Sequence, residues 1–184
     1  MRRAIGSGVP HRQPRLPTVW LMTDERLGDE LWRAIARLPR GAGIVFRHYA
    51  TPMPERRRLF ARVVRVARGR GLVVIRAGAR CGYGEAGTHN VVRHSPGLRT
   101  AAAHSRAEAI AAVLTRADAV FVSPVYPTRS HVGAPSLGAT SARRVVQGLP
   151  IYRIALGGMN AQRFRALKEF DGWAAIDAWS VSRN

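Results

Sequence analysis

Lysine, cysteine and long apolar runs are all scarce in this chain of 184 residues. Cys81 is the only cysteine, so no internal disulfide can form, and a reducing cytoplasm is the simplest location to expect. No apolar run approaches the roughly 20 residues that cross a bilayer, so we expect no membrane segment. Cys81 stands in a glycine-broken loop without an obvious base beside it, which argues against a catalytic nucleophile.

Negative charge is scarce as well. Only 11 Asp and Glu stand against 30 Lys and Arg, of which Lys168 is the only lysine, and the formal net charge is +19. Such a charge favours contact with polyanions. The arginines are spread along the whole chain, however, and aromatic residues do not interleave with them as a stacking platform would require. From the sequence we therefore expect solvated helix faces and no nucleic-acid partner.

Residues 1–17 are basic and rich in Pro and Gly, and they lack the apolar stretch of a signal peptide. We expect a flexible N-terminal segment there and a single domain over residues 18–184. Apolar residues make up 46% of the chain, which is enough for a substantial core.

From Thr18 onward, short apolar runs alternate with stretches of helical spacing. The runs predict strands over 19–22, 43–46, 72–75, 87–89, 98–103, 119–123, 151–156 and 173–177. The spacing predicts helices over 27–38, from about Thr51 to Gly69, and over 106–116, 141–147 and 161–170. Eight strands with helices between most of them favour an α/β fold, a (β/α)8 TIM barrel of parallel strands. Because no full-length helix fits into residues 76–97, we expect an abbreviated barrel.

A set of short motifs follows the predicted strands in a fixed order between about residues 19 and 179. They are Thr23-Asp24, Phe46-Arg47, His104-Ser105 with Glu108, Ser123-Pro124-Val125-Tyr126-Pro127-Thr128, Leu137-Gly138, Ala155-Leu156-Gly157-Gly158-Met159 and Ala174-Ala175-Ile176-Asp177-Ala178. In order and spacing this set resembles the thiamine phosphate synthase/thiazole tautomerase superfamily. The resemblance implies enzymes of thiamine biosynthesis, with the site at the carboxyl ends of the barrel strands.

The resemblance also implies a phosphate site. Backbone N–H groups at a Gly-Gly turn can approach a phosphate closely, hydroxyl groups can donate to it, and arginines can pair with it. Asp177 counts against this site unless an arginine pairs with it, because a carboxylate repels an anion. The expected phosphate-binding residues are Thr128, Ser130, Gly157, Gly158, Arg76 and His131, and Arg47 and His104 are the expected catalytic residues.

The metal half of the family's site departs from the pattern. The Asn-Asp pair that holds Mg²⁺ in the family is replaced by Arg76 and Ala77, and no acid follows His89. Mg²⁺ needs oxygen ligands, usually one or two carboxylates. We therefore expect no cofactor, with Mg²⁺ needed only if the usual synthase mechanism survives. A cluster of His48, His89, His131 and His104 in the barrel mouth fits no standard zinc spacing.

Three functions stay open from the sequence. The first is a thiamine-pathway enzyme, either a divergent synthase or a tautomerase-like isomerase that uses His104 for proton transfer. The second is a non-catalytic barrel that binds a phosphorylated ligand, and the third is a basic nucleic-acid-binding protein. The resemblance favours the first, with a phosphorylated thiazole or pyrimidine as partner, and it leaves a homo-oligomer open.

Overall fold

Eight parallel strands close into a barrel in the computed structural model, which describes residues 16–91, 96–128 and 135–179. Each strand pairs with the next one along the chain, and the last pairs with the first. The strands are β1 (Val19–Met22), β2 (Gly43–Phe46), β3 (Val73–Ala77), β4 (Gly87–His89), β5 (Leu98–Ala103), β6 (Ala119–Val122), β7 (Tyr152–Leu156) and β8 (Gly172–Ala175). The predicted barrel is thus confirmed.

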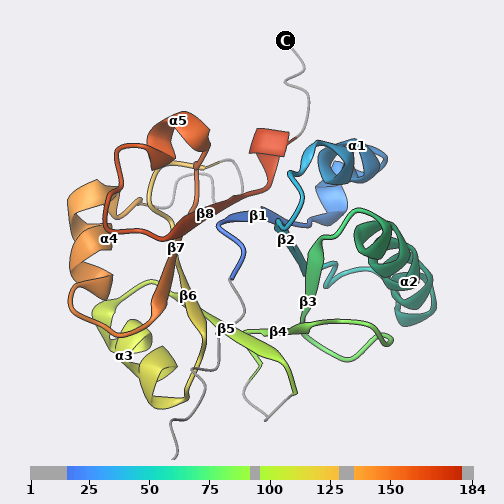
Figure 1. The fold of residues 1–184 in the computed structure, drawn as a ribbon, viewed down its shortest axis with the longest axis horizontal. Coiled ribbons are helices and arrows are strands. Elements are labelled where there is room, and N and C mark those ends of the chain that lie inside the picture. Colours follow the sequence, from blue (N-terminus) through green and yellow to red (C-terminus); the bar gives the residue numbers. More distant parts are fainter. Residues whose placement is uncertain (1–15, 92–95, 129–134, 180–184) are drawn as a thin grey trace, which may run out of the picture.

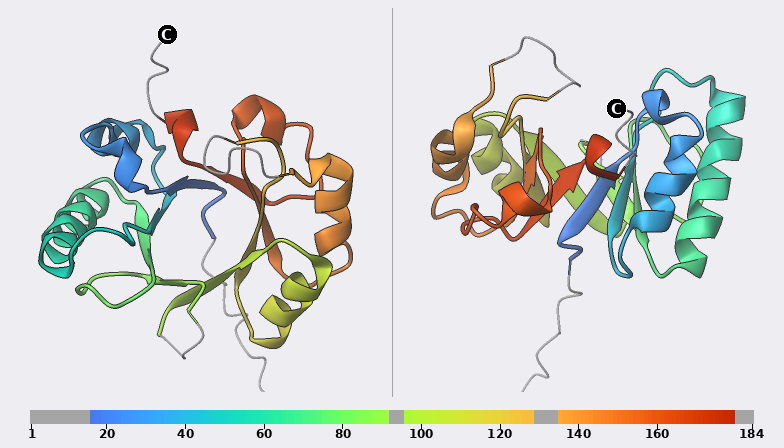
Figure 2. Two further views of the ribbon diagram at one scale, coloured as in Figure 1. Left: turned by 180° about the vertical axis from the view of Figure 1, so that it is seen from behind. Right: turned by 90° about the horizontal axis from the view of Figure 1, so that it is seen from above.

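The helices form an incomplete outer layer (Figures 1 and 2). They are η1 (Glu25–Leu27), α1 (Glu30–Arg37), α2 (Met53–Gly69), α3 (Arg106–Leu114), α4 (Gly138–Val146), α5 (Ala161–Phe164) and η3 (Asp177–Trp179). Figure 1 places α1 and α2 on one side of the ring of strands and α3, α4 and α5 on the other. Two apolar clusters fill the corresponding halves of the core.

Side chains alternate between the inside of the barrel and the helix layer, as the period of two in a strand requires. Inside, the Trp20 and Phe121 rings meet edge to face at 5.4 Å, and Phe121 makes a similar contact with His89 at 5.0 Å. Outside, Phe46 of β2 packs on Phe60 of α2, with ring centroids 5.1 Å apart. Both faces of the strands are therefore buried, which explains their continuous apolar runs.

The barrel is abbreviated around β4, because the structure describes no helix between β3 and β4 or between β4 and β5. Residues 78–86 link β3 to β4 as a loop, whereas α2 packs on the outer surface of β3. Arg76 points to this outer side, where its guanidinium pairs with Glu85 and also donates to the Gly78 carbonyl. The missing helix falls within residues 76–97, as predicted.

Most of the predicted helices and several of the strands differ from the structure by one or more residues at their ends. The helix expected over 27–38 runs from Glu30 to Arg37 as α1, because the separate turn η1, which Asp24 caps, ends at Gly28 with φ +48°. The helix expected over 161–170 stops at Phe164 and gives way to turns in which Leu167 N–H donates to Phe164 and Phe170 N–H to Leu167. The last strand ends at Ala175, and Asp177 begins η3.

The first described residues pack against the barrel. Leu16 is partly buried on the core, and Pro17 accepts a 2.7 Å hydrogen bond from the Trp20 indole. Residues 1–15 of the predicted N-terminal segment lie outside the described residues. Among the helices of the described ranges, none combines the length and apolar character needed to span a bilayer.

Gly43 is predicted to be indispensable for packing inside the barrel. The Trp20 ring lies against its Cα, and a Cβ added to Gly43 would lie 2.1 Å from Trp20 Cε3. Gly43→Ala should lower the free energy of unfolding by about 1–3 kcal/mol or more, because the indole has no free space to retreat into. Gly69→Ala is the matched control, since an added Cβ there meets nothing within 4 Å. Urea unfolding of both variants tests this, and equal effects would contradict it.

His89 is predicted to make stability depend on pH. It is buried inside the barrel, its Nδ1 is 2.8 Å from Thr100 Oγ1, and burial, with a smaller effect of Arg47, lowers its pKa from 6.5 to about 4. Between these two pH values the unfolded chain binds a proton at His89 and the folded chain does not. The free energy of unfolding is therefore highest above pH 6.5 and falls by about 3 kcal/mol in total as the pH drops toward 4.

His89→Gln removes the titrating group and should flatten the pH dependence of unfolding in that window. Urea unfolding at several pH values compares the variant with the unmodified chain, in which the acidic residues are the same. Parallel curves for the two proteins would show that His89 does not titrate as its burial requires.

Candidate functional site

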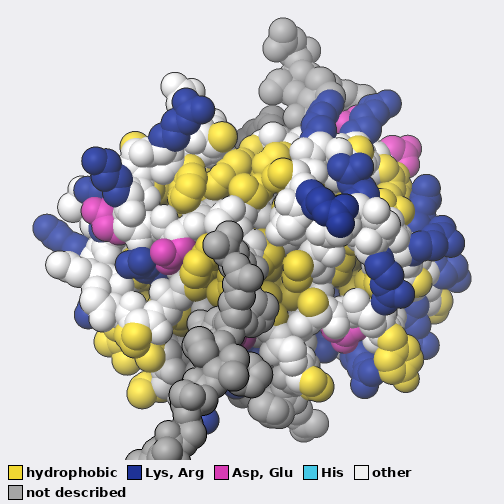
Figure 3. Space-filling view, viewed as in Figure 1, with side chains coloured by type: hydrophobic (Ala, Val, Ile, Leu, Met, Phe, Trp, Pro, Cys, Tyr) yellow, Lys and Arg dark blue, Asp and Glu magenta, His cyan; other side chains and the backbone are white. Residues whose placement is uncertain are grey.

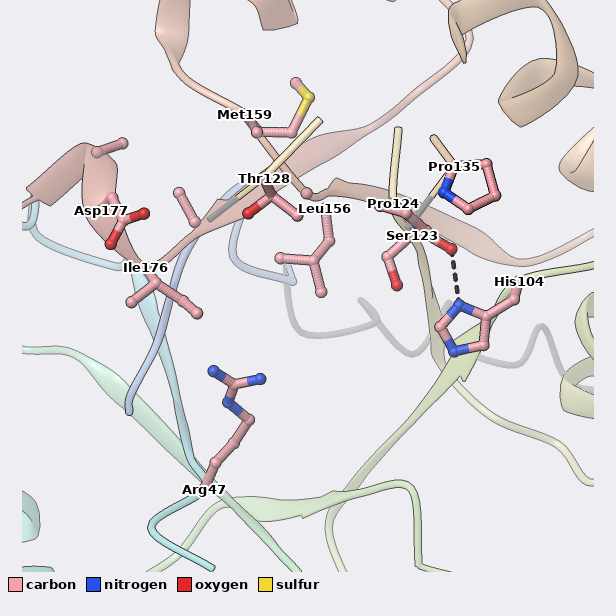
Figure 4. Close-up of a pocket in the computed structure, with 14 residues that line it drawn as sticks. Arg47, His104, Ser123, Pro124, Thr128, Pro135, Leu156, Met159, Ile176 and Asp177 are labelled. Carbon is pink, nitrogen blue, oxygen red and sulfur yellow. Dashed lines mark hydrogen bonds between the residues drawn. The ribbon is translucent and has the colours of Figure 1, made fainter. Parts of the chain in front are cut away.

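A cavity of about 280 Å³ opens at the carboxyl ends of the strands (Figure 4). Its walls are largely apolar, and its polar groups come from widely separated parts of the chain. It is lined by Arg47, His104, Ser123, Pro124, Thr128, Pro135, Leu156, Gly157, Gly158, Met159, Ala175, Ile176, Asp177 and Ala178. The predicted site residues Arg47, His104, Thr128, Gly157 and Gly158 thus share one cavity, whereas Ser130 and His131 lie outside the described residues.

His104 stands directly after β5 with its ring on the wall of the cavity (Figure 4). Its Nδ1 lies 2.7 Å from the carbonyl oxygen of Ser123. A carbonyl can only accept, so Nδ1 carries a proton, and Nε2 of the neutral ring is then a proton acceptor. Among the described residues, none forms a hydrogen bond with Nε2.

The start of α3 fixes His104. Ser105 caps this helix by accepting from the Glu108 N–H at 3.3 Å, and the Glu108 carboxylate accepts from the His104 N–H. The Glu108 carboxylate reaches one residue further back than it would in a standard capping box. The backbone at His104 is therefore fixed by β5, which ends at Ala103, and by the hydrogen bond to Glu108.

Arg47 reaches the cavity from the end of β2. Its Nε donates to the Thr23 carbonyl at 2.9 Å, and one Nη donates to Asp24 at 3.2 Å. Burial lowers the pKa of Arg47, but a guanidinium stays charged at any physiological pH. Burial alone would raise the pKa of Asp24, yet its bonds and charge interactions with Arg26 and Arg47 leave it below the usual value. Two arginines thus share the Asp24 carboxylate, which holds the Arg47 guanidinium at the edge of the cavity.

Arg56 holds the backbone beneath Arg47. It is 3% exposed, and its guanidinium donates to the carbonyls of Ala77 at 2.7 Å, Ala79 at 2.9 Å and Arg47 at 3.2 Å. Among the described residues, no carboxylate pairs with it. Arg56 therefore ties the chain after β2 to the chain after β3. The sequence carries a signal for this role, because Arg56 falls on the apolar stripe of α2, four residues before Phe60.

Gly157 and Gly158 form the turn after β7, with φ values of +92° and +60°. An added Cβ would lie 2.7 Å from Pro124 Cα at Gly157 and 2.5 Å from the Pro127 carbonyl oxygen at Gly158. Only glycine therefore fits where this turn meets the chain after β6. The helix expected to follow has only four residues, and Asn160 already caps it, so α5 contributes little dipole to an anion.

The structure does not bring Arg76 to the cavity. The register pairs Arg76 with Phe46, which faces α2, so its side chain lies on the outer face of the barrel. There its side chain is 8% exposed, and its Nε lies 3.3 Å from a carboxylate oxygen of Glu85. The sequence-based expectation that Arg76 binds phosphate at the mouth is not supported by this placement.

His48 and His89, the other two histidines among the described residues, are both buried. His48 is buried, stacks on Phe46 at 4.8 Å, and approaches Thr23 Oγ1 at 2.9 Å. Burial lowers its pKa, as it does for His89 inside the barrel. Neither histidine lines the cavity with His104.

The Mg²⁺ implied by the resemblance does not fit the residues present. The positions beside β3 and β4 are Arg76, which points outward, Ala77, and Asn90, whose side chain accepts from the Ala102 N–H. Within residues 16–91, 96–128 and 135–179, no group of three or more His, Cys, Asp or Glu could hold a metal ion. The donor set required by Mg²⁺ is thus missing on that side of the mouth.

Comparisons with known proteins concern the family and the barrel fold. A family model described as thiamine monophosphate synthase matches residues 88–179. Thiamine phosphate pyrophosphorylase from Pyrococcus furiosus has a similar structure, with a TM-score of 0.71, 23% identity, and coverage of 88% of this chain and 85% of that one. An HpcH/HpaI aldolase from Desulfitobacterium hafniense is more distant, with a TM-score of 0.53, 13% identity, and coverage of 87% and 86%.

A search of curated protein sequences gives no significant match. The two structural matches are below 25% identity and establish the barrel fold alone. The family model covers half of the chain, from β4 to η3, and includes His104, Thr128, Gly157 and Gly158. This protein therefore belongs to the thiamine monophosphate synthase family.

Proposed function

We propose that this protein binds a phosphorylated thiazole of thiamine biosynthesis at the barrel mouth and isomerises it by proton transfer through His104, without a metal ion. The hydrogen bond from His104 Nδ1 to the Ser123 carbonyl carries this proposal. It fixes the ring and makes Nε2 the proton acceptor. Taking a proton from one ring position and returning it to another changes neither the electron count nor the composition of the substrate, so the reaction needs no cofactor.

The opposite wall supports binding of the phosphate. The turn at Gly157 and Gly158 lets the backbone approach a ligand closely, and Thr128 adds a hydroxyl group to the same wall. Figure 4 shows Thr128 and His104 on separate parts of the wall, so a ligand can contact both. Asp177 lines the cavity too, and its carboxylate would repel a phosphate placed beside it.

Arg47 supplies the positive charge. Its guanidinium extends into the space below Leu156 and Ile176 (Figure 4). The ion pair with Asp24 and the bond to Thr23 hold it in place. The proposed substrate is a thiazole phosphate that also carries a carboxylate on its ring. A fixed guanidinium stabilises the negative charge that develops on this ring while the proton is on His104.

The synthase reaction is the second candidate, because the matching family model carries that description. Its diphosphate leaving group must be neutralised, and in the described part of the mouth the cation at hand is Arg47 rather than a metal site. A barrel that binds the phosphorylated ligand without turnover is the third outcome. One set of assays separates all three.

His104→Gln should abolish isomerisation of the thiazole carboxylate phosphate while ligand binding changes little. Glutamine can still donate to the Ser123 carbonyl, but it cannot take up a proton near neutral pH, so the rate should fall by about 10²–10⁴-fold. NMR of the substrate ring protons measures turnover, and calorimetry measures binding of thiazole phosphate. Unchanged turnover in the variant would remove His104 from the mechanism.

The same protein is incubated with pyrimidine diphosphate and thiazole phosphate, with and without Mg²⁺. Formation of thiamine phosphate at an ordinary, Mg²⁺-dependent rate would overturn both the proposed reaction and our view of the metal half. Binding of thiazole phosphate without any turnover would instead identify a non-catalytic barrel.

Gly158→Ala should weaken binding of thiazole phosphate by about tenfold or more, since an added Cβ would push the turn away from the Pro127 carbonyl. Gly148→Ala is the matched control. Gly148 has a similar φ of +71°, but an added Cβ there meets nothing within 4 Å, and it is not part of the cavity wall. Both variants carry the same backbone strain, so equal binding by both would argue against phosphate at this turn.

A further inference from the structure

The solvent face of α2 is built from arginine. Arg57, Arg58, Arg62, Arg65 and Arg68 are exposed, whereas Phe60, Val63, Val64 and Ala67 of the same helix are buried. The helical period therefore separates an apolar side, which packs on the barrel, from a side that carries five positive charges. We call these five arginines the α2 basic face. Figure 3 shows Lys and Arg side chains gathered on the side where Figure 1 places α1 and α2.

No charge within the described part of the chain neutralises this face. None of its five arginines forms an ion pair with a described carboxylate. Glu55 is the only acid of α2, and the next acid along the chain is Glu85, which is bound to Arg76. Glu30 of the neighbouring α1 already pairs with Arg33.

Neighbouring arginines strengthen the positive field. Arg37 donates to the Trp179 carbonyl at 2.8 Å, and Arg70 donates to the Ala36 carbonyl at 2.7 Å. Carbonyl partners order these side chains and leave their charge in place. Arg62 lies 4.0 Å above the Trp32 ring of α1, so one guanidinium of the α2 basic face is ordered as well.

The spacing along α2 sets like charges beside one another. Arg58 and Arg62 are four residues apart, and Arg62, Arg65 and Arg68 follow at intervals of three. Such pairs repel each other on a helix surface. Because these arginines form no ion pair with a described carboxylate, binding of an external polyanion would lower the repulsion between them.

We propose that the α2 basic face binds the phosphate backbone of double-stranded nucleic acid without sequence preference. From Arg57 to Arg68 the row is roughly 17 Å long at 1.5 Å per residue, and a duplex presents about one charge per 1.7 Å of its axis. Guanidinium groups match phosphate with two parallel hydrogen bonds. All five positions carry the same guanidinium group, which can pair with a phosphate at any step of a duplex whatever its sequence.

The composition of the face disfavours other polyanions. An acidic protein partner would need apolar or aromatic anchors, and a membrane surface would need large apolar side chains to insert. Between Arg57 and Arg68 the remaining exposed residue is Ala61. Bases of a single strand would need aromatic platforms, and the five positions carry none, while the ring of Tyr83 beside Arg65 and Arg68 already stacks with the Arg80 guanidinium. The sequence did not favour nucleic acid because its arginines are dispersed along the chain, whereas the fold gathers five of them on one helix.

The test measures binding of a fluorescent mixed-sequence DNA duplex by anisotropy over a series of salt concentrations. The test variant is Arg58→Gln/Arg65→Gln/Arg68→Gln, which leaves Arg62 on Trp32. We expect the slope of log K against log salt to become shallower by about 2 to 3, close to 0.9 per lost phosphate contact. The control is Arg144→Gln/Arg165→Gln/Lys168→Gln, three exposed cations on the α4 and α5 side, which changes net charge equally. The control should keep the original slope.

Equal loss in both triple variants would overturn the proposal, because net charge alone would then explain binding. So would a duplex that fails to bind, or tighter binding to phosphatidylserine vesicles, to an acidic peptide or to a single strand. Circular dichroism checks the fold, and if the triple variant unfolds, each single variant should lower the slope by about 1. The proposal is independent of the reaction at the mouth, so His104→Gln should bind duplex as the unmodified protein does.

Discussion

The strict alternation of side chains along eight paired strands decides which residues of this protein can do chemistry. The register that pairs Phe46 with Arg76 sends both side chains to the helix layer. Arg47 follows one position later, beyond the strand, and its side chain reaches the cavity. The two arginines at the ends of these adjacent strands therefore lie on opposite sides of the barrel wall. Arg47 lines the cavity, and Arg76 forms a buried ion pair in the outer layer. A closed barrel leaves no edge strand whose register could shift.

Polar groups at the mouth divide by chemistry. In the proposed reaction, His104, whose ring donates to the Ser123 carbonyl, moves the proton, and Gly157, Gly158 and Thr128 hold the phosphate. Arg47 adds a permanent positive charge. Its guanidinium donates to Asp24, and its backbone carbonyl accepts from Arg56. Apolar walls lower the local dielectric, which strengthens each of these few polar contacts.

Local sequence patterns predicted the architecture well. The strands at 19–22, 43–46, 87–89 and 98–103 were placed at the residues the structure assigns, because short apolar runs between turn residues are distinctive. The residues found together at the mouth were predictable too, since each follows a strand end. Arg76 was misplaced because β3 continues two residues past its apolar run, to Ala77. The place of Arg56 on the apolar stripe of α2 indicates burial, but the backbone carbonyls that accept from it cannot be identified from the sequence.

The nine-residue loop from 78 to 86 gives the barrel an uneven resistance to opening. Around most of the ring, a strand can separate only if a packed helix also moves away from it. β4 is the exception, because no helix is described on either side of it, so freeing this strand displaces a loop and the pair of Arg76 with Glu85 instead. Amide hydrogens of β4 should therefore exchange with solvent through local fluctuations, while those of β6 and β7 exchange only when the whole domain unfolds.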